Sequence, residues 1–262
     1  MKKTTLALLG AATLSFSAAS HAHFQMAYTP EMQLAKPATL DMKLVFGHPM
    51  ENGHVMDMEK PLEFFVQFKD KRTDLMSKLK EISWQGPENK AKAYQADVKV
   101  QRNGDYIFAV VPTPYYEKNE DVYIQQITKS FVNKGAMPTG WEEPLGLKTE
   151  ILPLNKPYQV FAGGTFSGKV ISDGKPVAGA ECEIEFVNTD INLEKNAFGK
   201  TNYREAPASA IVAFTDDNGV FTFGIPKAGT WGFACLGTGP DTEYQGKELS
   251  QDAVIWVQAK EL

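Results

Sequence analysis

The stretch "ADVKVQRNGDYIFAVVP", residues 96–112, decides the fold class. Ala96, Val98 and Val100 alternate with polar residues before Asn103-Gly104, and an apolar run follows this pair. A period of two places one face of an extended strand against a core. Asn-Gly favours a tight turn between antiparallel strands, because both residues tolerate positive φ. The stretch therefore predicts two strands joined as a β-hairpin.

Strand-like patterns of apolar residues continue through the chain. Alternating or continuous apolar runs recur at 39–47, 62–68, 121–133, 164–188, 211–237 and 252–258, with tight turns expected at Asp173-Gly174 and Asn218-Gly219. Only "TDLMSKL", residues 73–79, has a helix-like period, with Thr73 or Asp74 as a candidate N-cap. We therefore expect an all-β protein.

The sequence pattern changes near residue 162 to short strands joined by tight turns, and this change predicts two β-sandwich domains. Residues 23–162 would form an N-terminal β-rich domain that binds metal. Residues 163–262 would form a C-terminal sandwich, similar to transthyretin-like and carboxypeptidase-regulatory modules, and in it "NLEKNAFGKTNYREAPAS", residues 192–209, is expected to be a polar connecting loop.

The beginning of the chain is typical of a secretory signal peptide. Lys2 and Lys3 precede an apolar run from Leu6 to Phe16, and Ser20-His21-Ala22 has the pattern of a cleavage site. We expect residues 1–22 to be removed and the protein to be exported to the periplasm. His23 would then be the first residue, with a free α-amino group; the alternative is that cleavage falls there by chance.

Composition limits the remaining possibilities. The chain has 262 residues and a net charge of −5, and no basic patch suggests a nucleic-acid partner. No apolar run after the leader is long enough to cross a bilayer. Cys182 and Cys235 do not belong to a CxxC pair, and an oxidising compartment favours a disulfide between them over metal binding.

Histidine and methionine cluster near the start of the predicted mature chain. Its histidines, His23, His48 and His54, all lie in the opening segment, together with six methionines: Met26, Met32, Met42, Met50, Met56 and Met58. Imidazole suits nickel, copper and zinc, whereas a thioether suits copper(I). The clustering predicts a transition-metal site, although Met42 alternates with Leu40 and Leu44 as a core residue would.

The segment "FGHPMENGHVMDM", residues 46–58, carries most of these ligands. An ideal two-residue turn at Asn52-Gly53 would send His48 and His54 to opposite faces, so a shared ion requires a wider loop. Alternate residues of an extended strand point the same way. We therefore take as candidate metal ligands His23, His48, His54, Met50, Met56 and Met58. A polar surface loop with incidental histidines is the alternative.

A mature N-terminal histidine would also supply a chelate. Its α-amino nitrogen and Nδ1 can bind one ion, and a second histidine can complete a tetragonal set that favours copper(II) or nickel(II). Both groups must lose protons to bind, so affinity should fall below about pH 6.5, where imidazole protonates.

Several motifs resemble those of the DUF4198 family, the NikK/CbiK-like periplasmic components of nickel and cobalt uptake systems. They are "SHAHFQM" (residues 20–26), "FGHPMENGH", the connector "PLGLKTEILPLNKPY", "GKVISDGKPVAGAECEI" and "TDDNGVFTFGIPKAGTWGF". The resemblance implies a periplasmic metal-binding protein that serves an inner-membrane ABC or energy-coupling-factor importer. It assigns His23, His48 and His54 to the histidine-bearing positions.

The leading hypothesis is capture of Ni²⁺ or Co²⁺ for such an inner-membrane transporter. Copper (Cu⁺ or Cu²⁺) binding or trafficking through an N-terminal histidine brace and methionine ligands is the alternative. We expect no enzyme, because no histidine remains outside the opening segment to act as a base, and we rank a copper oxidase of polysaccharides low. A purely structural adhesin or carbohydrate-binding sandwich would not account for the histidine cluster.

Overall fold

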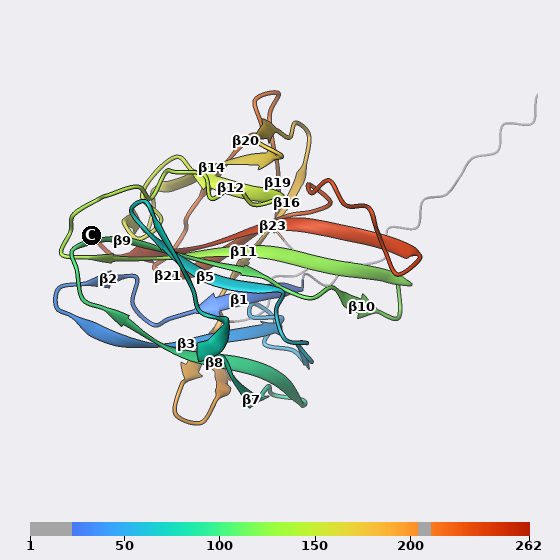
Figure 1. Cartoon of the computed structure of the whole chain (residues 1–262), viewed down its shortest axis with the longest axis horizontal. Helices are drawn as coiled ribbons and strands as arrows, with labels where there is room; N and C mark the ends of the chain where they lie inside the picture. Colours follow the sequence, from blue (N-terminus) through green and yellow to red (C-terminus); the bar gives the residue numbers. More distant parts are fainter. Residues whose placement is uncertain (1–22, 204–210) are drawn as a thin grey trace, which may run out of the picture.

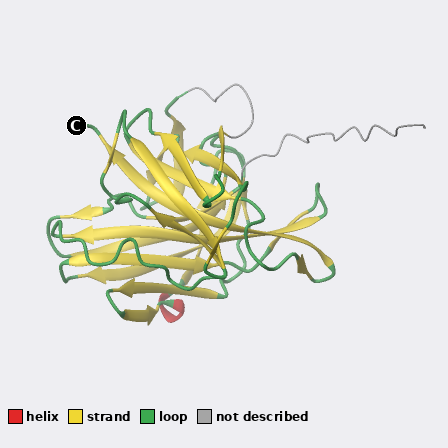
Figure 2. Ribbon diagram, turned by 90° about the horizontal axis from the view of Figure 1, so that it is seen from above, coloured by secondary structure: helices red, strands yellow, loops and turns green. Residues whose placement is uncertain are grey.

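The computed structural model describes residues 23–203 and 211–262, and it confirms the all-β class. Figure 1 shows three layers: a large middle sheet that contains β11 and β23, a sheet with β3 and β8 on one side, and a small sheet with β12 and β14 on the other. Strands dominate every layer in the perpendicular view of Figure 2. We call the layers sheet B (middle), sheet A (with β3) and sheet C (with β12).

Sheet A has seven strands in the order β1-β3-β8-β7-β18-β17, with β4 also paired to β3. Its strands are β1 (Phe24–Tyr28), β3 (Ala38–Gly47), β4 (Val55–Met56), β7 (Lys80–Gln85), β8 (Lys90–Val100), β17 (Thr189–Asn192) and β18 (Ala197–Thr201).

Sheet B has twelve strands, and its main path is β19-β16-β21-β23-β11-β9-β5-β6. Its strands are β2 (Gln33–Leu34), β5 (Glu63–Phe68), β6 (Lys71–Asp74), β9 (Gly104–Val111), β10 (Tyr115–Glu117), β11 (Val122–Lys134), β13 (Val160–Phe161), β16 (Glu181–Phe186), β19 (Ile211–Phe214), β21 (Gly229–Cys235), β22 (Glu243–Tyr244) and β23 (Lys247–Lys260).

Sheet C is the smallest layer, with the order β12-β14-β15 and with β20 paired to β14. Its strands are β12 (Thr149–Pro153), β14 (Thr165–Ser172), β15 (Lys175–Pro176) and β20 (Val220–Gly224).

The predicted hairpin at Asn103-Gly104 is wrong, although both strands exist. β8 pairs with β3 and β7 in sheet A, whereas β9 pairs with β5 and β11 in sheet B, so the turn crosses from one sheet to the other. Val98 and Phe108 pack in the same hydrophobic cluster between the sheets. The apolar faces of the two strands therefore meet across the core rather than side by side in one sheet.

Of the other two predicted turns, one joins paired strands of a single sheet and the other crosses between sheets. Asp173-Gly174 joins the paired strands β14 and β15, with Ser172 opposite Lys175. Both turn residues have positive φ, 47° and 75°, as a two-residue hairpin turn requires. Asn218-Gly219 forms a tight turn closed by the Gly219 N–H on the Asp216 carbonyl, but it joins β19 of sheet B to β20 of sheet C.

The two halves of the chain share sheet B. β11 and β23 pair in parallel from Tyr123↔Leu249 to Lys129↔Ile255. The predicted boundary near residue 162 thus lies between halves that are joined by a continuous ladder of hydrogen bonds. Independent folding of residues 23–162 and 163–262 stays a prediction.

Two local expectations need correction. In "TDLMSKL", residues 73–74 end β6, and only a single 3-10 turn follows (Met76–Lys78), with the Met76 N–H donating to Asp74 Oδ1 at 2.8 Å. The described part of the expected loop 192–209 contains β18, which pairs with β17 and touches β7 through Ala197↔Gln85. This β17–β18 hairpin extends sheet A because Phe198 is buried in the core against Trp84.

The predicted disulfide is confirmed. Cys182 on β16 and Cys235 on β21 are direct cross-strand partners joined by a 2.00 Å S–S bond, and both are fully buried. Phe166 and Phe233, whose tilted rings lie 4.8 Å apart between centroids, belong to the same hydrophobic cluster. Among the described residues no helix is long and apolar enough to cross a membrane.

Candidate metal site

The three predicted histidines lie in one row at the end of sheet A. Phe24 pairs with Gly47, and Gly47 pairs with Val55 on its other side. One residue further along each strand, the same registers place His23 opposite His48 and His48 opposite His54. Residues directly opposite each other in a sheet point to the same face. Register alone therefore brings together three side chains that stand one residue beyond the ends of β1, β3 and β4.

The distances agree with this row. The ring centroids of His23 and His48 are 4.6 Å apart, and those of His48 and His54 are 4.8 Å apart, close to the spacing of adjacent strands. One ligand atom from each histidine can be chosen so that all lie within 4.8 Å of one another. Bonds of about 2.0–2.1 Å put two imidazole nitrogens on opposite sides of an ion roughly 4 Å apart. Small side-chain rotations would thus let the three rings hold one ion.

The loop 48–54 has the width that a shared ion requires. Because Gly47 pairs with Val55, the chain does not turn tightly at Asn52-Gly53, and His48 and His54 face each other across the loop. Asn52 has a φ of 54° and donates through Nδ2 to the Gly199 carbonyl (3.1 Å) and to Thr201 Oγ1 (2.9 Å). The β17–β18 hairpin therefore anchors the loop from the C-terminal half.

Two further residues of the C-terminal half hold the same loop. Asn188 donates through its backbone N–H to the Pro49 carbonyl and through Nδ2 to the Met50 carbonyl, both at 3.0 Å. Glu185 Oε2 accepts the Met50 N–H at 3.2 Å. The half of the chain that supplies no histidine thus determines the shape of the histidine loop.

His23 is held on its backbone and on its ring. Gln126 Nε2 donates to the His23 carbonyl at 2.7 Å, and Gln126 Oε1 accepts the N–H of Gln25 at 2.7 Å. Glu117 Oε2 lies 3.2 Å from His23 Nε2. Such a carboxylate fixes the orientation of a ligating imidazole and raises its basicity. With Nε2 directed to Glu117, Nδ1 is the nitrogen that can bind an ion.

Sequence reasoning missed Glu117, and no local signal marks it. Glu117 lies on β10, which pairs with β11 in sheet B, so it reaches His23 only because sheets A and B pack together. Its burial, with 8% exposed, is unusual for a carboxylate and is consistent with a structural partner.

The row is buried at its centre and exposed at one end. His48 is 1% exposed, His23 is half-buried and His54 is exposed. Solvent therefore reaches the row from the side of His54.

The predicted methionine ligands are placed differently from one another. Met56 and Met58 are buried in the hydrophobic cluster between sheets A and B, and Met58 Sδ accepts a hydrogen bond from Gln25 Nε2 at 3.5 Å. Met50 is half-buried in the loop between His48 and His54. Core packing by itself accounts for Met56 and Met58, and a ligand role for any of the three stays a prediction.

Buried carboxylates lie on the strands of sheet B near this end of the molecule. Burial raises the pKa of Glu185 well above its usual range, although the Met50 N–H acts in the opposite direction. Burial also raises the pKa of Asp252, which accepts a hydrogen bond from Gln126 at 3.4 Å. Burial, and then the charges of neighbouring carboxylates, raise the pKa of Glu183 to about 7. Gln126 thus connects the His23 backbone to one member of this acidic group.

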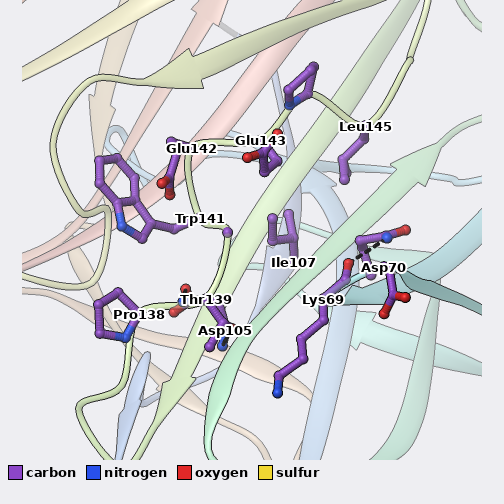
Figure 3. Close-up of a pocket in the computed structure, with 13 residues that line it drawn as sticks. Lys69, Asp70, Asp105, Ile107, Pro138, Thr139, Trp141, Glu142, Glu143 and Leu145 are labelled. Carbon is purple, nitrogen blue, oxygen red and sulfur yellow. Dashed lines mark hydrogen bonds between the residues drawn. The ribbon is translucent and has the colours of Figure 1, made fainter.

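A hollow elsewhere on the molecule holds none of the predicted ligands. Its volume is about 730 Å³, and it lies between β9 and the segment 138–145. Figure 3 shows Trp141, Glu142, Glu143, Lys69 and Asp70 around it. Asp105 also lines it, and its two carboxylate oxygens accept hydrogen bonds from Asn133 Nδ2 and the Thr139 N–H. Asp105 therefore holds the segment 138–145 in place rather than facing a ligand.

Comparison with known proteins identifies the family. Residues 20–239 match the family described as "Domain of unknown function (DUF4198)", and the chain belongs to this family. This confirms the family named by the resemblance, and the description assigns no activity. No curated protein matches the chain.

Several solved structures show weak similarity to the chain. The D0-D1 domain of Intimin is 10% identical, with 87% of this chain and 95% of that chain covered and a TM-score of 0.21. A chimeric titin Z1Z2 is 8% identical, with 94% and 99% covered and a TM-score of 0.24. The fibronectin(III)-like modules of Clostridium thermocellum CbhA are 8% identical, with 91% and 95% covered and a TM-score of 0.21.

Proposed function

We propose that this protein captures Ni²⁺, or Co²⁺, in the periplasm and passes it to an inner-membrane importer of the ABC or energy-coupling-factor type. The observation that supports this most is the row of His23, His48 and His54, whose ligand atoms lie within 4.8 Å of one another. Imidazole nitrogens suit these ions. A ligating histidine usually holds its other ring nitrogen against a carboxylate, a carbonyl or a water, and Glu117 is such a partner for His23. The role is binding rather than catalysis.

Export would add a further ligand. The predicted leader, residues 1–22, lies outside the described residues. Cleavage after Ala22 would free the α-amino group of His23, which with Nδ1 forms a chelate. With Nε2 donating its proton to Glu117, 3.2 Å away, Nδ1 is left to join the α-amino nitrogen in this chelate. Any added residue would convert the amine into an amide, which coordinates only after deprotonation.

The experiment uses the secreted protein. Intact mass fixes its first residue, and metal analysis is followed by competitive titration with nickel, cobalt, copper and zinc. We expect a start at His23, one equivalent of nickel or cobalt per chain, and much weaker binding by cytoplasmic protein that begins with an added methionine. His21→Gln is the matched histidine control, because that residue leaves with the leader. A start elsewhere, or equal affinity in the methionine-extended protein, would remove the amine from the site.

Copper binding or trafficking is the second candidate, and one observation favours it. Met50 is half-buried in the loop that carries His48 and His54, where a thioether could reach the same ion. Soft sulfur ligands select Cu⁺. Preference for Cu⁺ over Ni²⁺ in the same titration, lost in Met50→Leu, would replace the nickel proposal by this one.

A further inference from the structure

A separate pocket adjoins the histidine row and has no role in the site as described. Its volume is about 310 Å³, at the lower end of the range for sites that bind small organic molecules. Its walls are mainly apolar and aromatic and come from Phe46, Tyr115, Tyr116, Tyr123 and Ile124. The pocket therefore suits a compact ligand with an apolar or aromatic body.

Two of these walls also contact His23. The Phe46 ring lies 5.7 Å from the His23 ring and the Tyr115 ring lies 6.3 Å from it, measured between centroids. Phe46 and Tyr115 pack edge to face at 5.3 Å. The pocket is thus one aromatic side chain away from the candidate metal ligands.

Part of the polar lining of the pocket belongs to the His23 site. Gln25 and Gln126 line the pocket together with the charged side chains of Asp57, Glu59 and Lys118, and Gln126 is the residue that holds the His23 carbonyl. A ligand that presses on Gln126 or on the Phe46–Tyr115 pair would therefore act on the position of His23.

The histidine row also leaves room for a ligand from solution. Its three imidazoles and the α-amino group of His23 supply four nitrogen donors. A six-coordinate nickel ion therefore keeps two positions for further nitrogen or oxygen donors.

We propose that the pocket holds the apolar side chain of a small N,O-chelating molecule, of the amino-acid type, that binds together with the metal ion. The protein then captures the ion as a complex. The chelator completes the coordination of the ion, and its apolar body packs on Phe46 and Tyr115. This inference rests on the proposed function.

The test compares two chelators with the same donor atoms. L-Phenylalanine and glycine both bind Ni²⁺ through an amine and a carboxylate, and only phenylalanine has a ring to bury. Titrations are set to the same free Ni²⁺ concentration with each chelator and with nickel alone. We expect nickel to bind at least tenfold more tightly with phenylalanine than with glycine. Native mass spectrometry should show protein, nickel and phenylalanine in one complex.

Two pocket variants make the test specific. Ile124→Trp fills the pocket and Tyr123→Ala removes a wall, and neither residue belongs to the histidine row. Both should reduce the advantage of phenylalanine to about onefold while binding of nickel alone stays unchanged, which also shows that the variants are folded.

The possible results separate the two proposals. Nickel binding with no advantage for phenylalanine, or stripping of nickel by both chelators, would overturn the chelator inference and leave the proposed function intact. Phenylalanine binding that is equal without nickel and in His48→Gln would also overturn it, because the pocket would be an independent site. Failure to bind nickel under all conditions would overturn the proposed function itself.

Discussion

The histidine row and the disulfide are the same geometric arrangement with different outcomes. Cys182 and Cys235 are direct cross-strand partners on β16 and β21, and His23, His48 and His54 continue the cross-strand registers of β1, β3 and β4. The cysteines are fully buried in an aromatic core, whereas the row runs from buried His48 to exposed His54. Strand pairing brings the side chains together in both places, but their chemistry differs: two thiols oxidise to a covalent bond, whereas imidazoles can only share a ligand, which reaches the row from its exposed end at His54.

The comparison also separates the tasks of the two halves. The N-terminal half supplies every histidine of the row, and the C-terminal half supplies the contacts from Asn188, Glu185 and the β17–β18 hairpin that shape the loop 48–54. The C-terminal half should therefore affect metal binding through position and not through direct coordination.

Loss of the central histidine should have the largest effect. Structural zinc sites with four ligands are worth roughly 10–16 kcal/mol, or about 2.5–4 kcal/mol per ligand. His48→Gln should thus weaken nickel binding by roughly a hundred- to a thousandfold in competitive titration. Gln is chosen because His48 is 1% exposed and Ala would leave a cavity. Unchanged affinity in a folded His48→Gln protein would remove the histidine row from the site.

The disulfide should matter to stability and not to binding. Its cysteines are separated by 53 residues, and a loop of that length corresponds to about 4 kcal/mol in the chain-entropy treatment. The double variant Cys182→Ala, Cys235→Ala should lose about this much free energy of unfolding in urea. Nickel affinity, measured at a temperature where the variant is folded, should change less than about threefold. A large loss of affinity there would break the comparison between the two cross-strand clusters.

The buried acid Glu183 should make stability fall as pH rises. Its pKa is about 7 in the folded state, against 4.5 when exposed, so the folded state binds the proton more tightly. Stability from this group is present below about pH 4.5 and is lost as pH rises through about 7. Relative to wild type, Glu183→Gln should gain up to about 3 kcal/mol at pH 8 and little at pH 4. A gain that is independent of pH would contradict this assignment.

Glu117 should affect affinity through His23. Loss of a hydrogen-bond partner of a metal ligand costs typically 10–100-fold in affinity. Glu117→Gln should weaken nickel binding by about this factor and should shift its pH dependence, since His23 would lose the adjacent negative charge. Glu59→Gln is the matched control, because Glu59 is an exposed carboxylate that pairs with Lys92. Equal effects of the two variants would mean that only net charge matters.

The methionines should have the smallest effect on nickel. The triple change of Met50, Met56 and Met58 to Leu keeps apolar volume, and each such substitution costs less than about 1.5 kcal/mol of stability. Ni²⁺ affinity should remain within a few-fold, whereas Cu⁺ affinity should fall if sulfur binds it. Met137→Leu, at an exposed position, is the control. Equal loss for both ions in a folded protein would show that sulfur is a nickel ligand too.

Local sequence determined much of this protein. Alternating apolar residues were enough for the all-β class, and Asp173-Gly174 was enough for a hairpin, because both depend on neighbours in the chain. The cysteine pair and the clustered histidines were also visible, since they depend on residue type and on the compartment that the leader predicts. None of these required knowledge of which strands pair.

Only the tertiary structure decided which surfaces meet. Asn103-Gly104 looks like Asp173-Gly174 in sequence, yet it crosses between sheets, because Val98 of one strand and Phe108 of the other are both buried in the hydrophobic cluster between the sheets. The row of His23, His48 and His54 depends on the registers of β1 and β4 with β3, and a slip of one residue would turn the side chains to the other face. Glu117 reaches His23 only through the packing of sheet B on sheet A. Register and sheet packing are set by contacts between distant residues, and no local pattern contains them.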